Sequence, residues 1–181
     1  MRKTMRKSRN ALKQAGTHAD KSAAACQHIL GYIKEHSCKI VASYLAIGGE
    51  LNVSALHEAK PRVKLCLPFI LENRRGLAFR SYGANTLIEP GPMNTFQPSE
   101  IEQIVVPDTI LVPLLAFDRN GMRLGQGGGY YDSTIVSMRR NKQVSRVIGV
   151  GFACQEVDEV PYKPHDAALD AIATEDGIIY R

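Results

Sequence analysis

A strand, an arginine, a run of glycines and a helix start follow one another between residues 109 and 132, and together they could hold phosphate. Residues 109–115 (TILVPLL) read as a buried strand, and RLGQGGGYYD follows a turn at 123–132. Glycines let backbone N–H groups approach an anion because no Cβ intervenes, and a helix start adds unpaired N–H donors. Arg123 adds a fork-shaped cation, and Asp132 is a carboxylate of the kind that holds magnesium beside a nucleoside triphosphate.

The glycine stretch matches neither of two common phosphate-binding motifs. It lacks the G-x-x-x-x-G-K-[ST] order of a Walker A loop, and Gly125, Gly127 and Gly128 do not give the G-x-G-x-x-G of a dinucleotide fold. Taken alone, four glycines in five residues fit a flexible turn as well as an anion site. A plain turn needs no buried strand before it and no arginine within it, so the flanks favour an anion site.

Length and composition indicate a single globular domain spanning residues 1–181. The chain has 44% apolar residues, enough for its own core, and no apolar run long enough to span a membrane. Cys26, Cys38, Cys66 and Cys154 form neither a C-x-x-C pair nor a zinc spacing. We therefore expect reduced thiols in a cytoplasmic protein.

The net charge of +5 comes from the N-terminus. Residues 1–16 carry six basic residues and no acidic one, and the rest of the chain is near neutral, which argues against a broad nucleic-acid surface. This basic segment, expected to be a helix, fits three interpretations: a solvated helix face, an organellar presequence and an anion-binding arm near the active site.

Hydrophobic periodicity predicts strands that alternate with helices. Helices are expected at 1–15, 17–36, 53–59 and from the glycines to Arg139-Arg140; strands at 39–47, 63–70, 77–82, 109–115, 146–152 and, as the final strand, 171–174; and a long irregular loop at 83–100. This order indicates a mainly parallel sheet with helices on both faces. Ligands collect beyond the carboxyl ends of such strands, so 44–50, 116–132 and the loop after Phe152 should meet there.

The stretch from Pro113 to Asp132 resembles the 5-formyltetrahydrofolate cyclo-ligase family, whose members are also called methenyltetrahydrofolate synthetases. It reads P-x-x-A-F-D-x-x-G-x-R-L-G-x-G-x-G-Y-Y-D. The resemblance extends over nearly the whole chain, through Ser43-Tyr44-Leu45 with Glu50, Ile88-Glu89-Pro90, Pro164-His165-Asp166 with Asp170 and Thr174-Glu175, and the basic N-terminal helix.

The resemblance implies a single-domain, three-layer α/β/α sandwich and an enzyme that uses Mg-ATP to cyclise 5-formyltetrahydrofolate to 5,10-methenyltetrahydrofolate, releasing ADP and phosphate. The formyl oxygen attacks the γ-phosphorus to give a phosphorylated N5-iminium intermediate, and N10 then closes the ring as phosphate leaves. Such phosphoryl transfer depends on positioning and charge stabilisation rather than on a protein nucleophile. The implied partner is a small-molecule folate, with or without a polyglutamate tail; neither a membrane nor a nucleic acid is expected.

By position, the resemblance makes Arg123 the catalytic cation and assigns three sets of binding residues. The ATP set is Arg2, Lys3, Arg6, Arg123, Leu124, Gly125, Gln126, Gly127, Gly128, Gly129, Tyr130 and Tyr131. The folate set is Arg2, Leu45, Glu50, Gln126, Gly127, Gly128, Gly129 and Tyr130, and the magnesium pair is Asp132 and Asp166.

Two positions depart from the family pattern. A lysine that members often carry shortly before the N-terminal arginine is missing; either Lys3, Arg6 or Lys7 replaces it, or the start of the sequence is truncated. Gln126 stands where members often have tyrosine or arginine.

Structural interpretations stand beside these functional ones. Asp132 suits a helix N-terminus, Asp166 suits a turn, Glu50 could cap the helix that follows it, and Tyr130 and Tyr131 could be core residues. For the whole chain, two alternatives to the ligase are a sugar-phosphate isomerase-like enzyme that uses the glycine loop for a substrate phosphate, and a nucleic-acid-binding module led by the basic arm.

Overall fold

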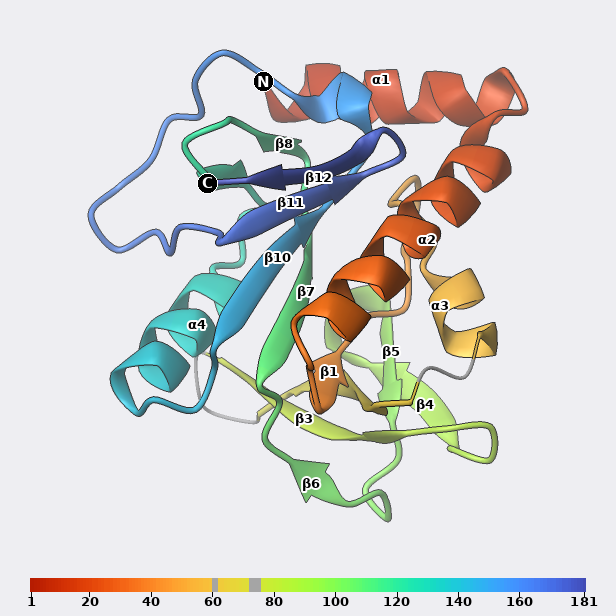
Figure 1. Ribbon diagram of the computed structural model, residues 1–181, viewed down its shortest axis with the longest axis vertical. Helices are drawn as coiled ribbons and strands as arrows, with labels where there is room; N and C mark the ends of the chain where they lie inside the picture. Colours follow the sequence, from red (N-terminus) through yellow and green to blue (C-terminus); the bar gives the residue numbers. More distant parts are fainter. Residues whose placement is uncertain (60–61, 72–75) are drawn as a thin grey trace.

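The computed structural model describes residues 1–59, 62–71 and 76–181, and a mixed β-sheet forms its centre (Figure 1). The strands of this sheet are β1 (Ile40–Ala42), β2 (Lys64–Ile70), β3 (Leu77–Tyr82), β6 (Ile104–Val105), β7 (Thr109–Pro113), β10 (Arg146–Val150), β11 (Ala171–Thr174) and β12 (Gly177–Tyr180). Their order is β12-β11-β10-β7-β1-β2-β3-β6. The strands from β11 to β2 run parallel, and β12, β3 and β6 join at the edges antiparallel. The predicted mainly parallel α/β sheet is confirmed.

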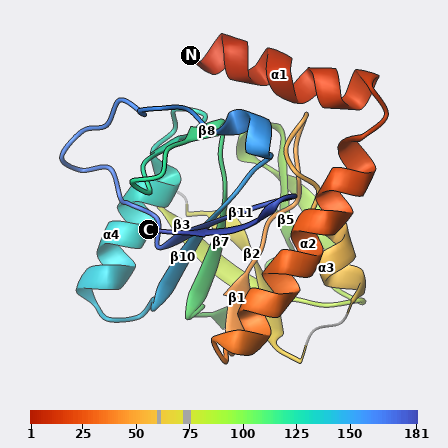
Figure 2. The same ribbon diagram turned by 45° about the horizontal axis from the view of Figure 1, so that its top comes forward.

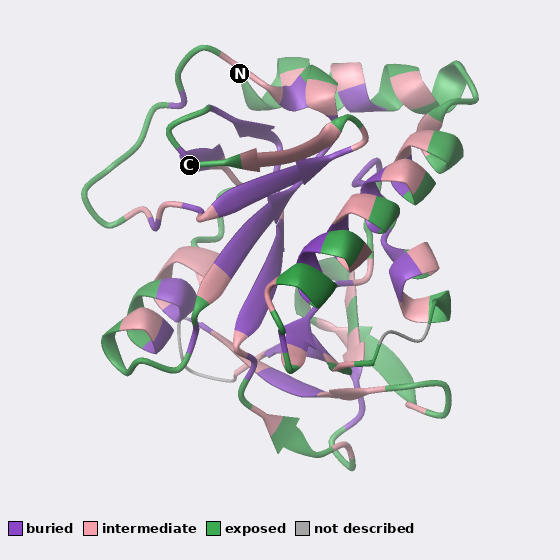
Figure 3. Ribbon diagram, in the orientation of Figure 1, coloured by how far each residue is buried: buried purple, intermediate pink, exposed green. Residues whose placement is uncertain are grey.

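Helices cover both faces of the sheet. α2 (His18–Glu35) and α3 (Ser54–Glu58) pack on one face, and α4 (Tyr130–Arg140) packs on the other. Successive strand residues point to opposite faces, so Val41 joins the core under α2 and α3 while Ala42 joins the core under α4. Figure 3 shows the central strands buried between these helices. The three-layer α/β/α architecture is therefore confirmed.

The first helix, α1 (Arg2–Gln14), belongs to neither layer. It crosses above the carboxyl ends of the central strands, as Figures 1 and 2 show, and contacts the short 3-10 helix Ala153–Gln155. Most of its residues are exposed or half-buried, and Arg9 is its one buried side chain. The basic helix thus lies over the edge of the sheet where ligands are expected.

The prediction of an irregular loop at 83–100 is wrong. β4 (Ile88–Gly91) and β5 (Thr95–Pro98) form an antiparallel hairpin, joined by the 3-10 turn Pro92–Asn94. Prolines argued against strands here, but proline is tolerated where no ladder hydrogen bond is needed from its nitrogen, and Pro90 pairs with Phe96 in the two-stranded ribbon.

Two strand predictions are also corrected. The strand expected at 39–47 ends at Ala42, because residues 43–50 leave the sheet to form one wall of a cavity. The strand at 171–174 is not the last, since β12 turns back and pairs with it antiparallel. A second small hairpin, β8 (Ala116–Phe117) with β9 (Arg123–Leu124), precedes the glycines and holds Arg123.

The cysteines are free thiols: Cys26, Cys38 and Cys66 are buried and Cys154 is exposed. In the described part of the chain, no helix combines the length and apolar character needed to cross a membrane.

Candidate active site

A cavity of about 810 Å³ lies at the carboxyl edge of the sheet. Its walls include residues from all three segments predicted to meet there, within 44–50, 123–133 and 161–166, together with residues of the β4–β5 hairpin. Ligand sites of this size bury most of a small molecule. The predicted meeting of the three segments is confirmed.

The glycine loop joins β9 to α4 and forms one wall of the cavity. Gly127 has a φ of +113° and Gly129, the residue before α4, has a φ of +67°. Both values lie in backbone regions that L-residues rarely adopt. Glycine is thus required for the loop conformation as well as for access to its backbone, and the loop leads straight into the positive end of an eleven-residue helix.

Alanine at Gly127 should therefore strain the loop. We expect Gly127→Ala to lower the free energy of unfolding by about 1–3 kcal/mol. Gly125→Ala is the matched control: a Cβ at Gly125 meets nothing within 4 Å and the residue has no positive φ, so the expected change is within about 0.5 kcal/mol. Urea unfolding of both variants checks this, and equal losses would contradict the role assigned to the Gly127 backbone.

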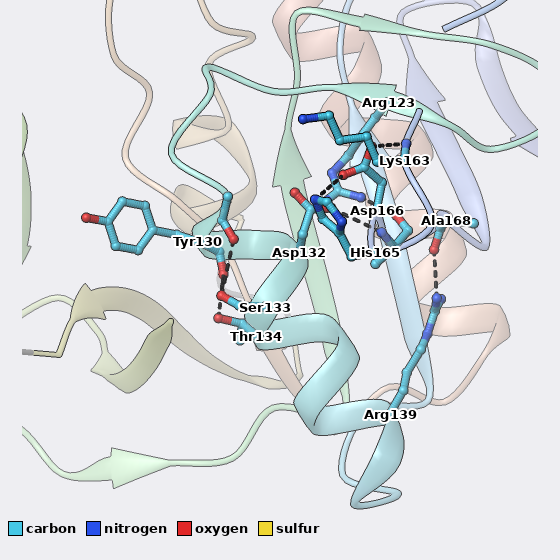
Figure 4. Close-up of polar contacts among 12 residues, drawn as sticks. Arg123, Tyr130, Asp132, Ser133, Thr134, Arg139, Lys163, His165, Asp166 and Ala168 are labelled. Atoms are coloured by element: carbon cyan, nitrogen blue, oxygen red, sulfur yellow. Dashed lines mark hydrogen bonds and ion pairs between the residues drawn. The ribbon is translucent and has the colours of Figure 1, made fainter. Parts of the chain in front are cut away.

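Arg123 ties three segments together beneath the cavity (Figure 4). Its Nη2 donates to Oδ1 of Asp132 on α4 at 2.6 Å, and its Nη1 donates to the carbonyl of Ala167. The same Asp132 oxygen accepts the Ala167 N–H at 3.1 Å. The Arg123 side chain is only 4% exposed, and burial lowers its pKa, an effect opposed by Asp132 and then Asp166. Arg123 is thus a buried cation at the cavity wall, held in one orientation.

Asp132 and Asp166 both line the cavity, and each uses one oxygen in the fold. Oδ1 of Asp132 bonds Arg123 and Ala167, and Oδ2 of Asp166 accepts the Lys163 N–H at 2.7 Å. The structural interpretations therefore hold for both residues. Within the described residues, no hydrogen bond takes the second oxygen of Asp132, and Oδ1 of Asp166 has only the His165 ring, at 3.9 Å.

These two carboxylates suit a hard cation that shares its other sites with water and phosphate. Magnesium typically keeps several waters and binds through one or two carboxylates together with substrate phosphates. Across the described residues, no group of three or more His, Cys, Asp or Glu side chains is placed to hold a metal, so such an ion would depend on the ligand's own oxygens. The donor set fits magnesium delivered with a nucleotide.

Glu50 is a buried carboxylate at the same cavity. Its side chain does not cap the following helix, which begins only at Ser54, but accepts the Ile47 N–H at 3.1 Å. The residue is 6% exposed, and burial raises its pKa, an effect opposed by the Ile47 N–H, Arg9 and Gln126. A buried acceptor of this kind is suited to a ligand that presents paired N–H donors.

Two arginines of α1 reach the glycine loop. Nε of Arg2 donates to the Gly125 carbonyl at 3.0 Å, and Nη2 of Arg6 donates to the Gln126 side chain at 2.7 Å. Arg2 lines the cavity, whereas Lys3 neither lines it nor makes a side-chain hydrogen bond within the described residues. The structure thus brings two of the three predicted N-terminal bases to the loop.

The remaining predicted residues also lie in the cavity wall. Leu45, Leu124, Gln126, Tyr130 and Tyr131 all line it. Tyr131 is in addition packed against the core under α4, so its structural interpretation holds too. Figure 4 shows the Tyr130 ring pointing away from the Arg123–Asp132 pair.

Sequence reasoning missed several cavity residues. Met93 and Phe96 come from the unpredicted hairpin, and Tyr162 and Lys163 come from the proline-flanked loop before Asp166. A lysine three residues before a predicted metal ligand was the available signal for Lys163. Nothing in the local pattern marked Met93 or Phe96, whose apolar side chains are 66% and 57% exposed.

Fold and cavity together define an α/β/α domain with a ligand site at the carboxyl edge of its sheet. Comparison with known proteins makes this more specific. The chain belongs to the 5-formyltetrahydrofolate cyclo-ligase family, whose model matches residues 1–175.

Individual relatives agree with this membership. The chain is 31% identical to the 5-formyltetrahydrofolate cyclo-ligase of Escherichia coli over 141 residues, covering 74% of this chain and 76% of that protein. It is 29% identical to the Haemophilus influenzae protein of the same name, covering 79% of each. The solved structure of Aquifex aeolicus 5,10-methenyltetrahydrofolate synthetase superposes with a TM-score of 0.79 at 26% identity, covering 99% of this chain and 90% of that one.

Proposed function

We propose that this chain catalyses the ATP-dependent cyclisation of 5-formyltetrahydrofolate to 5,10-methenyltetrahydrofolate, with release of ADP and phosphate. The observation that carries the proposal is one cavity, in a member of this family, that contains the glycine loop, Arg123, two carboxylates and a buried glutamate. Family membership favours this reaction over the isomerase and nucleic-acid alternatives.

The glycine loop and α1 bind the triphosphate of ATP. Backbone N–H groups of 125–129 and the N-terminus of α4 face an anion, and Arg2, held against the Gly125 carbonyl, adds positive charge at the cavity wall. Arg6, through Gln126, fixes the far side of the loop. Among the candidates to replace the lysine that family members often carry near the N-terminus, we assign this role to Arg6 rather than to Lys3.

Asp132 and Asp166 hold magnesium through the oxygens that the fold leaves to the cavity. Magnesium supplies charge neutralisation for the β- and γ-phosphates when bound. The Arg123–Asp132 ion pair keeps the Asp132 carboxylate in a fixed position for this task.

Glu50 binds the folate by its pterin end. A carboxylate accepts two adjacent N–H donors as a pair, which is the pattern that a 2-amino-4-oxo ring presents. Leu45, Met93 and Phe96 give apolar contact to the rings. The turn that carries Met93 belongs to the β4–β5 hairpin, which is separate from the central sheet. This hairpin acts as a lid over the folate-binding part of the cavity.

The protein's part in the reaction is positioning and charge stabilisation. Glu50 orients the folate so that its formyl oxygen meets the γ-phosphorus in line, and Arg123 stabilises the charge on the phosphoryl group as ADP leaves. The product of this step is a phosphorylated N5-iminium, whose carbon is attacked by N10. Ring closure expels phosphate, and the N10 proton passes to solvent.

We further propose a cytoplasmic enzyme whose partner is the small-molecule folate alone, with or without a polyglutamate tail. Three features support this: the thiols are free, the chain beyond α1 is near neutral, and the Arg2 and Arg6 side chains of α1 contact the glycine loop.

Phosphate release distinguishes the ligase from an isomerase. With Mg-ATP present, we expect inorganic phosphate to appear only after 5-formyltetrahydrofolate is added, and not after sugar phosphates are added in its place. Folate-independent ATP hydrolysis, or turnover of a sugar phosphate without ATP, would contradict the proposal.

A further inference from the structure

Arg9 is a buried cation without a full set of hydrogen-bond partners. It is 4% exposed, although α1 is otherwise largely open to solvent. Its Nη1 donates to the Leu114 carbonyl at 3.4 Å, and its Nε has no partner in the described structure. A buried charge with so few hydrogen bonds is costly unless another charge compensates it.

The nearby carboxylate that compensates it is Glu50, at a longer range than the 4.0 Å of a direct ion pair. Arg9 lies against Gly49, since a Cβ added there would be 3.6 Å from the Arg9 Cβ and 3.8 Å from its Nε. Burial lowers the pKa of Arg9, and Glu50 is the strongest of the groups that oppose this. Reciprocally, burial raises the pKa of Glu50, and among the residues that the structure describes Arg9 is the cation that opposes this.

Further titratable or polar groups surround the two residues. They are Arg6 and Lys13 on α1, His18 on α2, Tyr44 after β1, Gln126 in the glycine loop, Tyr131 on α4 and Cys154 in the short 3-10 helix. His18 contacts the Glu50 carbonyl rather than its carboxylate, at 3.1 Å.

We propose that Arg9 is a positioning residue: its buried charge, packed against Gly49 and outside the cavity wall, keeps the neighbouring Glu50 carboxylate ionised for the folate. Arg9 is absent from the cavity wall while Glu50 forms part of it, so Arg9 acts through Glu50. Arg9 lies on the helix that also carries Arg2 and Arg6 to the glycine loop. The packing of α1 that brings these arginines to the ATP site therefore also places the charge that keeps Glu50 ionised for folate. This inference rests on the proposed role of Glu50.

The test is the titration of Glu50 in the ligand-free protein. Carboxyl-labelled glutamate gives an NMR signal for each side chain, and Glu50→Gln identifies the one that belongs to Glu50. We expect Arg9→Gln and Arg9→Met to raise the midpoint pH of the Glu50 titration (the Glu50 midpoint) by about one unit or more. Arg9→Lys, which keeps the charge, should raise it by less than half as much. Lys7→Gln, which removes an exposed charge from the same helix, should leave it unchanged.

Arg9→Met guards against misfolding, because an apolar side chain of similar length replaces a buried charge without adding an unpaired polar group. A Glu50 midpoint in either folded neutral variant that equals the wild-type value would overturn the proposal, as would an equal shift in Lys7→Gln. The titration needs no folate, so a failure of the proposed reaction would leave this result intact. If the reaction holds, the KM for folate in the neutral Arg9 variants should begin to rise at a higher pH than in the wild type, in step with the Glu50 midpoint. A purely structural role of Arg9 would not produce this shift.

Discussion

Replacing Arg123 with alanine is expected to lower kcat by about a thousandfold, the effect typical of losing a cation aligned on a transferring phosphoryl group. The expectation follows from its place in the cavity wall and from its fixed orientation, because Asp132 and the Ala167 carbonyl hold the guanidinium on two sides. The same contacts mean that the variant also loses about 1–3 kcal/mol of unfolding free energy. Steady-state kinetics must therefore be measured on protein shown to be folded by circular dichroism.

Arg139→Ala is the matched control for Arg123→Ala. Arg139 bonds the Ala168 carbonyl at 2.7 Å (Figure 4) and pairs with Asp170 at 2.8 Å, yet it lies outside the cavity wall. Its loss likewise removes a bond to a backbone carbonyl and an ion pair with an aspartate, but this pair is more exposed than the Arg123–Asp132 pair. We therefore expect a smaller loss of stability, with kcat near the wild-type value. Equal losses of kcat in both variants would show that Arg123 serves only the fold.

Glu50→Gln is expected to raise the KM for 5-formyltetrahydrofolate about a hundredfold while leaving the KM for ATP within about threefold. The variant keeps the shape of the side chain but removes the charge, and a buried hydrogen bond to a charged group is worth about 1.5–3 kcal/mol. Glu58→Gln, on the exposed end of α3, is the control and should change neither constant. A similar rise in both KM values for Glu50→Gln would mean that Glu50 maintains the structure of the cavity and does not bind the folate.

The Glu50 interaction also predicts a direction of pH dependence. Burial raises the pKa of Glu50 above its ordinary value of 4.5, so the carboxylate takes up a proton at a higher pH than an exposed glutamate does. Folate affinity should therefore fall as the pH is lowered towards this raised pKa. Glu50→Gln should have a folate KM that is flat over the same range.

The sequence predicted the sheet and most of the site because both depend on local signals. Hydrophobic runs predicted the central strands, and the rule that ligands bind beyond the carboxyl ends of strands predicted that Glu50, Arg123 and Asp166 meet at one site. Family resemblance supplied roles that spacing left open, such as the proposed magnesium role of Asp132 beside its place in the first turn of α4.

The missed features depend on contacts between distant segments. The β4–β5 hairpin is rich in proline and glycine, which local propensity assigns to loops, and its pairing is visible only in three dimensions. Arg9 looked like one more basic residue of a solvated helix, because its burial results from where α1 crosses the sheet edge. Likewise, the Arg123–Asp132 pair joins the β8–β9 hairpin to α4, so their spacing of nine residues gave no sign of contact.

The most direct test of the account is formation of the methenyl product. Folded wild-type protein is mixed with magnesium, ATP and 5-formyltetrahydrofolate, and the near-ultraviolet absorbance of 5,10-methenyltetrahydrofolate is followed. The account predicts a rise that requires both substrates, yields one phosphate per methenyl group and nearly vanishes in Arg123→Ala. The absence of any ATP-dependent rise with folded wild-type protein would contradict it.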